Sequence, residues 1–118
     1  MTASTVSLVG ALCHSQRVFL PLLDEHMADN FGEILPHLVM SDIVRAMADQ
    51  AELQEAWCRE VWDWLDAAYL DGDEAERELL VVSGVEMIPD PGERGAEMRA
   101  MLGPNLRPFV SWTDPRGK

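Results

Sequence analysis

Apolar residues recur at helical spacing along most of the chain. This spacing predicts helices over about 15–30, from Ile34 or Pro36 to 49, 50–70 and 74–87, followed by a shorter helix over about 93–102. A strand is the alternative for the apolar run 79–82, but the acidic residues before it favour a helix. No segment alternates apolar and polar residues for long enough to indicate a strand, so the pattern predicts an all-α fold. The helix over 50–70 should be the longest, and its expected core stripe is Leu53, Trp57, Val61, Trp64, Leu65 and Ala68.

Glycine and proline mark the boundaries of these elements and become frequent toward the C-terminal end. Gly72 supplies a helix stop, and Asp73 is the expected N-cap of the next helix. We expect a single domain over residues 1–118, a helical bundle of about five helices with an irregular C-terminal tail, in which residues 1–13 and 113–118 fray. The tail carries apolar residues that should dock on the core: Leu106, Phe109, Val110 and Trp112.

Composition and charge narrow the classes of partner. The 118 residues are 47% hydrophobic, which is ordinary for a globular domain. Acidic residues number 21 against 9 basic ones, and the net charge of -12 repels phosphate backbones and anionic lipids. We therefore expect no nucleic-acid or membrane partner, and no apolar run approaches the roughly 18 residues of a membrane-spanning helix. Two cysteines, Cys13 and Cys58, are too few for a disulfide scaffold, which favours a reducing cytoplasm.

Recognisable catalytic and metal-binding motifs are absent from the sequence. The three histidines lie far apart and form no zinc-protease motif, and no serine-hydrolase, phosphate-loop or dinucleotide-loop motif occurs. Cys58 lies among acidic residues with no histidine one turn away, which weakens a thiol as a nucleophile. The sequence therefore predicts a protein without catalytic residues, metal or cofactor.

The strongest feature of the sequence is an acidic stretch over residues 49–78. It holds eleven acidic residues and two arginines, a net charge of -9. Aromatic side chains at the edge of an acidic helix face are typical of a binding hot spot with a charged rim. The alternative is that the aromatics pack inside the bundle and the acids only solvate it. The candidate partner-binding residues are Glu55, Trp62, Asp63, Asp66, Tyr69, Asp71 and Asp73.

Asp42 is the one acidic residue that the periodicity places within an apolar arc, among Leu35, Val39 and Ala46. A carboxylate in that position must be paired, cap a helix restart, or face a partner. We favour a buried ion pair with Arg45 or Arg107, whose loss should destabilise the fold.

The segment Leu35–Asp42, with the sequence LPHLVMSD, resembles a helix motif of a family of small uncharacterised bacterial proteins. The resemblance spans about residues 26–107 and includes the segments 82–88 and 102–107, although Gly84 replaces an aromatic residue of the family. It implies no established catalytic activity, and it implies a likeness to immunity proteins that are encoded beside secreted toxins. The residues that it singles out are His37, Asp42, Glu86 and Arg107.

These observations lead to two competing expectations about function. The first is a cytoplasmic bacterial immunity protein, not an enzyme, that neutralises a cognate toxin with a basic surface through its acidic face. The second is a small enzyme or small-molecule-binding bundle with a site near His37, Asp42 and Glu86.

Overall fold

The computed structural model describes residues 3–113 of the chain, and the side chains of residues 4–110. This part contains six α-helices and three 3-10 helices and no strand, which confirms the all-α prediction but exceeds the expected number of about five helices. The α-helices are α1 (Ala3–Ser15), α2 (Leu20–Asp29), α3 (Pro36–Gln50), α4 (Glu55–Asp71), α5 (Glu74–Val82) and α6 (Arg107–Thr113), and the 3-10 helices are η1 (Arg17–Phe19), η2 (Val85–Met87) and η3 (Ala96–Met101).

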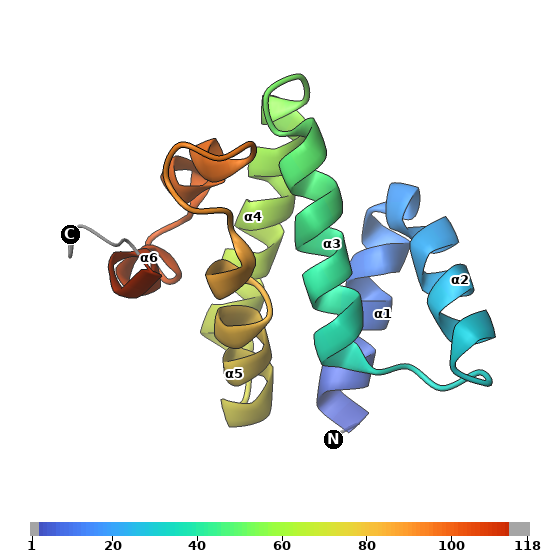
Figure 1. Ribbon diagram of the computed structural model, residues 1–118. Coiled ribbons are helices and arrows are strands. Elements are labelled where there is room, and N and C mark those ends of the chain that lie inside the picture. Colours follow the sequence, from blue (N-terminus) through green and yellow to red (C-terminus); the bar gives the residue numbers. More distant parts are fainter. Residues whose placement is uncertain (1–2, 114–118) are drawn as a thin grey trace.

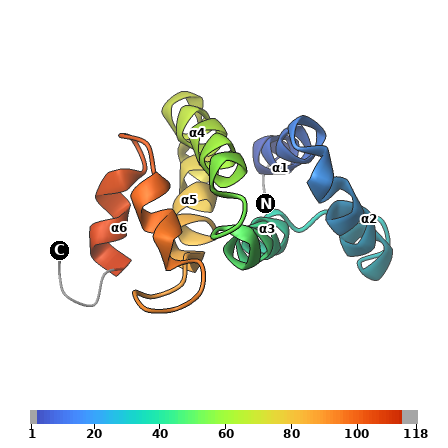
Figure 2. The same ribbon diagram turned by 90° about the horizontal axis from the view of Figure 1, so that it is seen from above.

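Helix α3 runs through the middle of the molecule (Figure 1). Helices α1 and α2 lie on one side of it, and α4 and α5 lie on the other (Figures 1 and 2). Helix α1 packs on both α3 and α5, whereas α2 packs on α3, α1 and η1 at one edge of the molecule. Helix α6 lies at the opposite edge, where it packs on η2.

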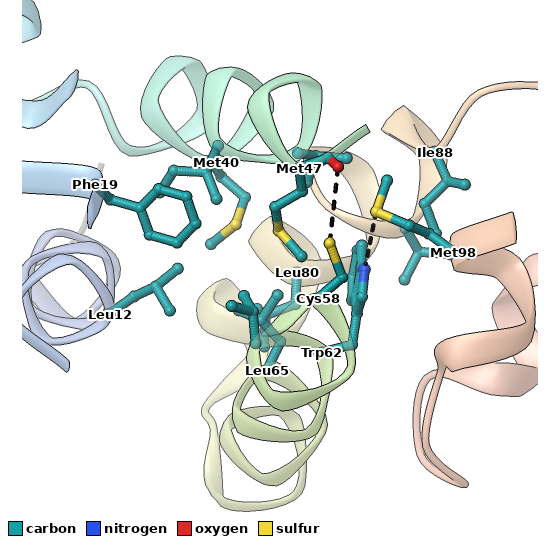
Figure 3. Close-up of a cluster of buried hydrophobic side chains, with 14 of the residues drawn as sticks. Leu12, Phe19, Met40, Met47, Cys58, Trp62, Leu65, Leu80, Ile88 and Met98 are labelled. Carbon is teal, nitrogen blue, oxygen red and sulfur yellow. Dashed lines mark hydrogen bonds between the residues drawn. The ribbon is translucent and has the colours of Figure 1, made fainter. Parts of the chain in front are cut away.

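The core is a single cluster to which α1, α3, α4 and α5 and the 3-10 helices all contribute (Figure 3). Trp62 of α4 is completely buried, and its indole N–H donates to Sδ of Met98 over 3.3 Å. The thiol of Cys58 donates to the backbone oxygen of Met47 over 3.7 Å. The polar atoms of both buried side chains therefore have partners. Helix α3 contributes five wholly buried residues, Val39, Met40, Ile43, Val44 and Met47.

The N-terminal segment forms a regular helix, so the expectation that residues 1–13 fray is wrong for residues 3–13; residues 1–2 lie outside the described part. The buried residues of α1 recur at helical spacing: Thr5, Leu8, Val9, Leu12 and Cys13. The opposite face is made of small uncharged residues, so the sequence shows little contrast between the two faces. No single described helix is long and apolar enough to cross a membrane; 4–15 and 17–29 pass that test only as a pair, bent by 111°.

The long central helix starts later than predicted, at Glu55, because residues 51–53 form a turn. Leu53 is 81% exposed, so its place in the core stripe is wrong. The buried stripe is rotated relative to the prediction and consists of Cys58, Val61, Trp62, Leu65 and Asp66. With 17 residues, α4 is nevertheless the longest described helix, as expected.

Helix α5 begins as predicted and ends earlier. Asp73 accepts a hydrogen bond from the backbone N–H of Glu76, whose side chain accepts from the N–H of Asp73, which completes a capping box. The helix ends at Val82 instead of residue 87. The backbone at Gly84 then lies close to the last turn of the helix. A Cβ atom on Gly84 would lie 2.2 Å from the backbone oxygen of Leu80, so any side chain at this position would require the backbone to shift.

The C-terminal part is more regular than predicted. The expected helix over 93–102 is a 3-10 helix, η3, and residues 107–113 form α6 in place of an irregular tail. Leu106 is buried, and Phe109 packs against Tyr69 with ring centroids 5.5 Å apart, which confirms that this segment docks on the core. The side chain of Trp112 and residues 114–118 lie outside the described part.

Candidate partner-binding surfaces

Asp66, expected to be an exposed acid that steers a partner, is only 7% exposed. Its Oδ1 accepts from the backbone N–H groups of Asn105 and Leu106, and its Oδ2 accepts from the side-chain amide of Asn105, each over 2.9 Å. A carboxylate satisfied by three donors is a structural group. The assignment of Asp66 to a binding site is therefore wrong.

Trp62 is likewise removed from the candidate surface. None of its side chain is exposed, because the position faces η3 and the core instead of the flank of α4 (Figure 3). The alternative weighed for Trp62, packing inside the bundle, is the one the structure has. Tyr69 is partly buried, lies beside Phe109, and has the guanidinium of Arg77 over its ring at 5.0 Å.

The other four candidate residues remain exposed: Glu55, Asp63, Asp71 and Asp73. We call them the α4 acidic surface. Glu55 pairs with Arg59 one turn away over 3.1 Å, an exposed pair that contributes little to stability. The pKa of Asp73 is lowered because its carboxylate accepts hydrogen bonds, first from the backbone of Glu76 and then from the hydroxyl of Ser4. Asp73 is therefore a helix cap as well as an exposed charge.

A shallow groove of about 290 Å³ lies between α1 and α4 and includes Asp71 of this acidic surface. Half-buried Trp64 lines it together with Leu8, Ala11 and Ala68, and Asp71 and Glu76 provide its acidic end. Trp64 was expected in the core, so the structure exchanges the roles of Trp62 and Trp64. The sequence signal for this exchange is Cys58, which lies one turn before Trp62 and marks the truly buried stripe.

The three residues proposed for an alternative small-molecule site each have their own surroundings. Nδ1 of His37 is 2.6 Å from the hydroxyl of Ser83. Asp42 forms an ion pair with Arg45 over 2.6 Å, so its predicted pairing is confirmed, but 46% of its side chain is exposed and its predicted burial is wrong. Glu86 is exposed on η2.

A second hollow, of about 420 Å³, lies between α2 and α3 and was not anticipated from the sequence. Leu22, Glu25, His26 and Asp29 of α2 line it, with Asn30 after the end of that helix. Leu38 and Asp42 line it from α3. We call this the α2–α3 hollow.

The connection that follows α2 exposes a large aromatic residue. Phe31 has a relative exposure of 102% and a positive φ of 56°, and Gly32 follows with a φ of 81°. The N–H of Glu33 donates to the oxygen of Asn30 over 3.0 Å and closes the turn. Two positive φ angles in succession favour Asn-Gly or Gly-Gly. In the sequence, Gly32 alone indicated a turn here, and Phe31 is an unusual residue for its first position.

The described residues offer little nucleophilic or metal-binding chemistry. Burial raises the pKa of the Cys13 thiol to about 11. Burial, and then the negative charge of Glu97, raise the pKa of Cys58. Thiols with a raised pKa hold little thiolate at neutral pH. Within the part of the chain that the structure describes, no three histidine, cysteine or acidic side chains are grouped to hold a metal ion.

No protein-family model, curated protein or solved structure matches this chain. The resemblance of LPHLVMSD to a bacterial family therefore stays a prediction. The exposed surfaces of the protein are therefore the observations that bear on its function.

Proposed function

We propose that this protein is a non-catalytic interaction protein that binds a basic protein partner through the α4 acidic surface, in the manner of an immunity protein that neutralises a toxin. The observation that carries the proposal is the exposure of four acids, Glu55, Asp63, Asp71 and Asp73, of which Asp71 lines the groove that contains Trp64. Charged residues around a partly apolar centre accelerate association and leave the centre to slow dissociation.

The arrangement of the groove supports a division of roles within this surface. Ala11, Trp64 and Ala68 offer apolar area that a partner can cover, whereas Asp63 and Asp71 act at longer range. Trp64 takes the role of anchor that the sequence suggested for Trp62. A bacterial source and a cytoplasmic location belong to the same proposal, since an immunity protein protects the cell that makes the toxin.

The test uses the protein encoded by the gene next to that of this chain. Association and dissociation rate constants are measured between the two purified proteins across a salt series. Exposed charges are screened beyond about 8 Å at physiological ionic strength. The double variant Asp63→Asn and Asp71→Asn should therefore associate more slowly, and its association rate should depend less on salt.

A matched pair of variants separates the anchor from the charges. Trp64→Ala should dissociate roughly thirtyfold faster or more, which corresponds to a hot spot of about 2 kcal/mol, with little change in association. Glu86→Gln removes an exposed charge from η2 and should leave both rates unchanged. An association rate that does not respond to salt, together with normal binding by folded Trp64→Ala, would exclude the α4 acidic surface.

A further inference from the structure

The α2–α3 hollow lies apart from the α4 acidic surface. Helix α2 forms one edge of the molecule, and α3 separates it from α4 and α5 (Figure 2). The α2 residues that line the hollow are spaced as one helical face, and Leu38 and Asp42 are one turn apart on α3. Two regular helices therefore hold its walls in place.

The lining of the hollow is acidic. It contains three carboxylates, Glu25, Asp29 and Asp42, and none of the lining residues in the described part of the chain is a lysine or arginine. Arg45 pairs with Asp42 from outside the lining, over 2.6 Å. The acids thus come from both helices, and among the side chains that the structure describes only Arg45 forms an ion pair with one of them.

The polar groups at the end of the hollow are already engaged in the fold. Nε2 of buried His26 accepts from the backbone N–H of Leu35 over 3.0 Å. The side-chain amide of Asn30 donates to the backbone oxygen of His26 over 2.8 Å. These bonds fix the wall and leave the three carboxylates as the groups that can receive a donor from outside.

Apolar surface adjoins these carboxylates. Leu22 and Leu38 line the same hollow, and Leu38 is 53% exposed. Phe31 lies outside the lining, directly after the lining residue Asn30 in the chain, and is completely exposed. Its turn favours asparagine or glycine at this position, so local backbone preference does not explain the aromatic residue.

We propose that the α2–α3 hollow receives an arginine side chain of a partner protein, and that Phe31 and Leu38 pack on an apolar residue next to that arginine. The guanidinium group presents five N–H donors in a plane and suits carboxylates that come from two directions. Its aliphatic stem can cover Leu22 and Leu38. A lysine ammonium is more strongly hydrated and carries no planar fork, so it fits this combination less well.

The probe is a short peptide, capped at both ends, with one arginine between two leucines. Its binding to the full chain is followed in amide NMR spectra. We expect chemical-shift changes at residues of α2 and α3 that line the hollow. Replacing the arginine of the peptide by citrulline, its uncharged isostere, should weaken binding by about tenfold or more. The lysine peptide should also bind more weakly.

Variants of the chain locate the binding to the hollow. Asp29→Asn and Phe31→Asn should each weaken binding by about fivefold or more, because one removes a carboxylate and the other the apolar contact. Arg45→Gln frees Asp42 and should strengthen binding. Asp24→Asn is the matched control, since Asp24 is an exposed acid of α2 outside the lining.

Several outcomes overturn the proposal. These are equal binding of the citrulline or lysine peptide, equal binding of capped arginine alone, or a loss of binding with Asp24→Asn as large as with Asp29→Asn. Shifts confined to residues around Asp63 and Asp71 would assign the peptide to the α4 acidic surface instead. Because the probe is not the partner tested above, failure here leaves the proposed function standing.

Discussion

Asp66 and Asn105 are joined by two hydrogen bonds of 2.9 Å, one from the backbone N–H and one from the side-chain amide of Asn105. The pair ties the middle of α4 to the turn that precedes α6. Gly103 permits this approach, because a Cβ atom there would lie 2.5 Å from Cγ of Asp66. Arg107 completes the turn by donating from Nη2 to the backbone oxygen of Leu102 over 2.7 Å.

Asp66→Ala should destabilise the fold by about 3 kcal/mol, since it leaves the donors of Asn105 and Leu106 without their acceptor. Urea unfolding of the two proteins measures the difference. Asp63→Ala, one turn earlier on the exposed side of α4, is the control and should change stability by less than about 0.5 kcal/mol. Equal effects of the two substitutions would contradict a structural role for Asp66.

Trp62→Ala should cost about 3–5 kcal/mol, because it opens a cavity beside Met98 in the core. Trp64→Ala should cost only about 1 kcal/mol, since that side chain is half-buried over a groove. Thermal unfolding of both variants checks the order, and the reverse order would mean that the core stripe is the one the sequence pattern suggested.

Phe31→Asn should stabilise the protein by about 1 kcal/mol, because asparagine tolerates the left-handed backbone conformation that phenylalanine adopts there at a cost. Phe31→Ala is the control: it removes the same aromatic ring but keeps a residue that disfavours a positive φ. A higher melting temperature for Asn than for Ala supports the account. Equal melting temperatures would show that φ at this position carries no strain.

The cap of α5 should make stability depend on pH in acid. The pKa of Asp73 in the folded protein lies below its ordinary value of 3.8, because the backbone N–H of Glu76 favours the ionised form. The stabilisation is therefore fully present above that ordinary value and is lost as the pH falls through the lower folded pKa. The difference in melting temperature between the wild type and Asp73→Asn should shrink as the pH falls to about 2.5. A difference that stays constant with pH would rule out this role.

Apolar residues at helical spacing were enough to predict that α3 and α4 are helices, but not which face of α4 is buried: of its predicted stripe only Val61 and Leu65 are fully buried. Asp66 could not be predicted in the same way. The backbone N–H groups that donate to its carboxylate belong to residues 39 and 40 positions later in the chain. A helical wheel contains no such long-range contact, so it suggests that any acid beside the core stripe is exposed to solvent. The turn-forming residues Gly103 and Pro104 indicated a turn there, but not that it would fold onto α4.

Asp42 shows a second limit of the sequence pattern. Its spacing from Leu35 and Val39 suggests burial, yet α2 covers α3 incompletely at this point and leaves the hollow that Asp42 lines. Whether a position within an apolar arc is buried depends on the neighbouring helix. The pattern of α3 alone contains no information about where α2 ends.

The packing of α1 on α5 brings together segments about 60 residues apart, and the hydroxyl of Ser4 reaches the carboxylate of Asp73. During synthesis α1 leaves the ribosome long before α5 exists. Until α5 has been translated, the apolar face of α1, which includes Leu8 and Leu12, lacks its contact with α5. Completion of the fold thus depends on the synthesis of α5, and a chain interrupted before residue 74 would leave exposed the part of this face that α5 covers, although α3 could still pack on the rest.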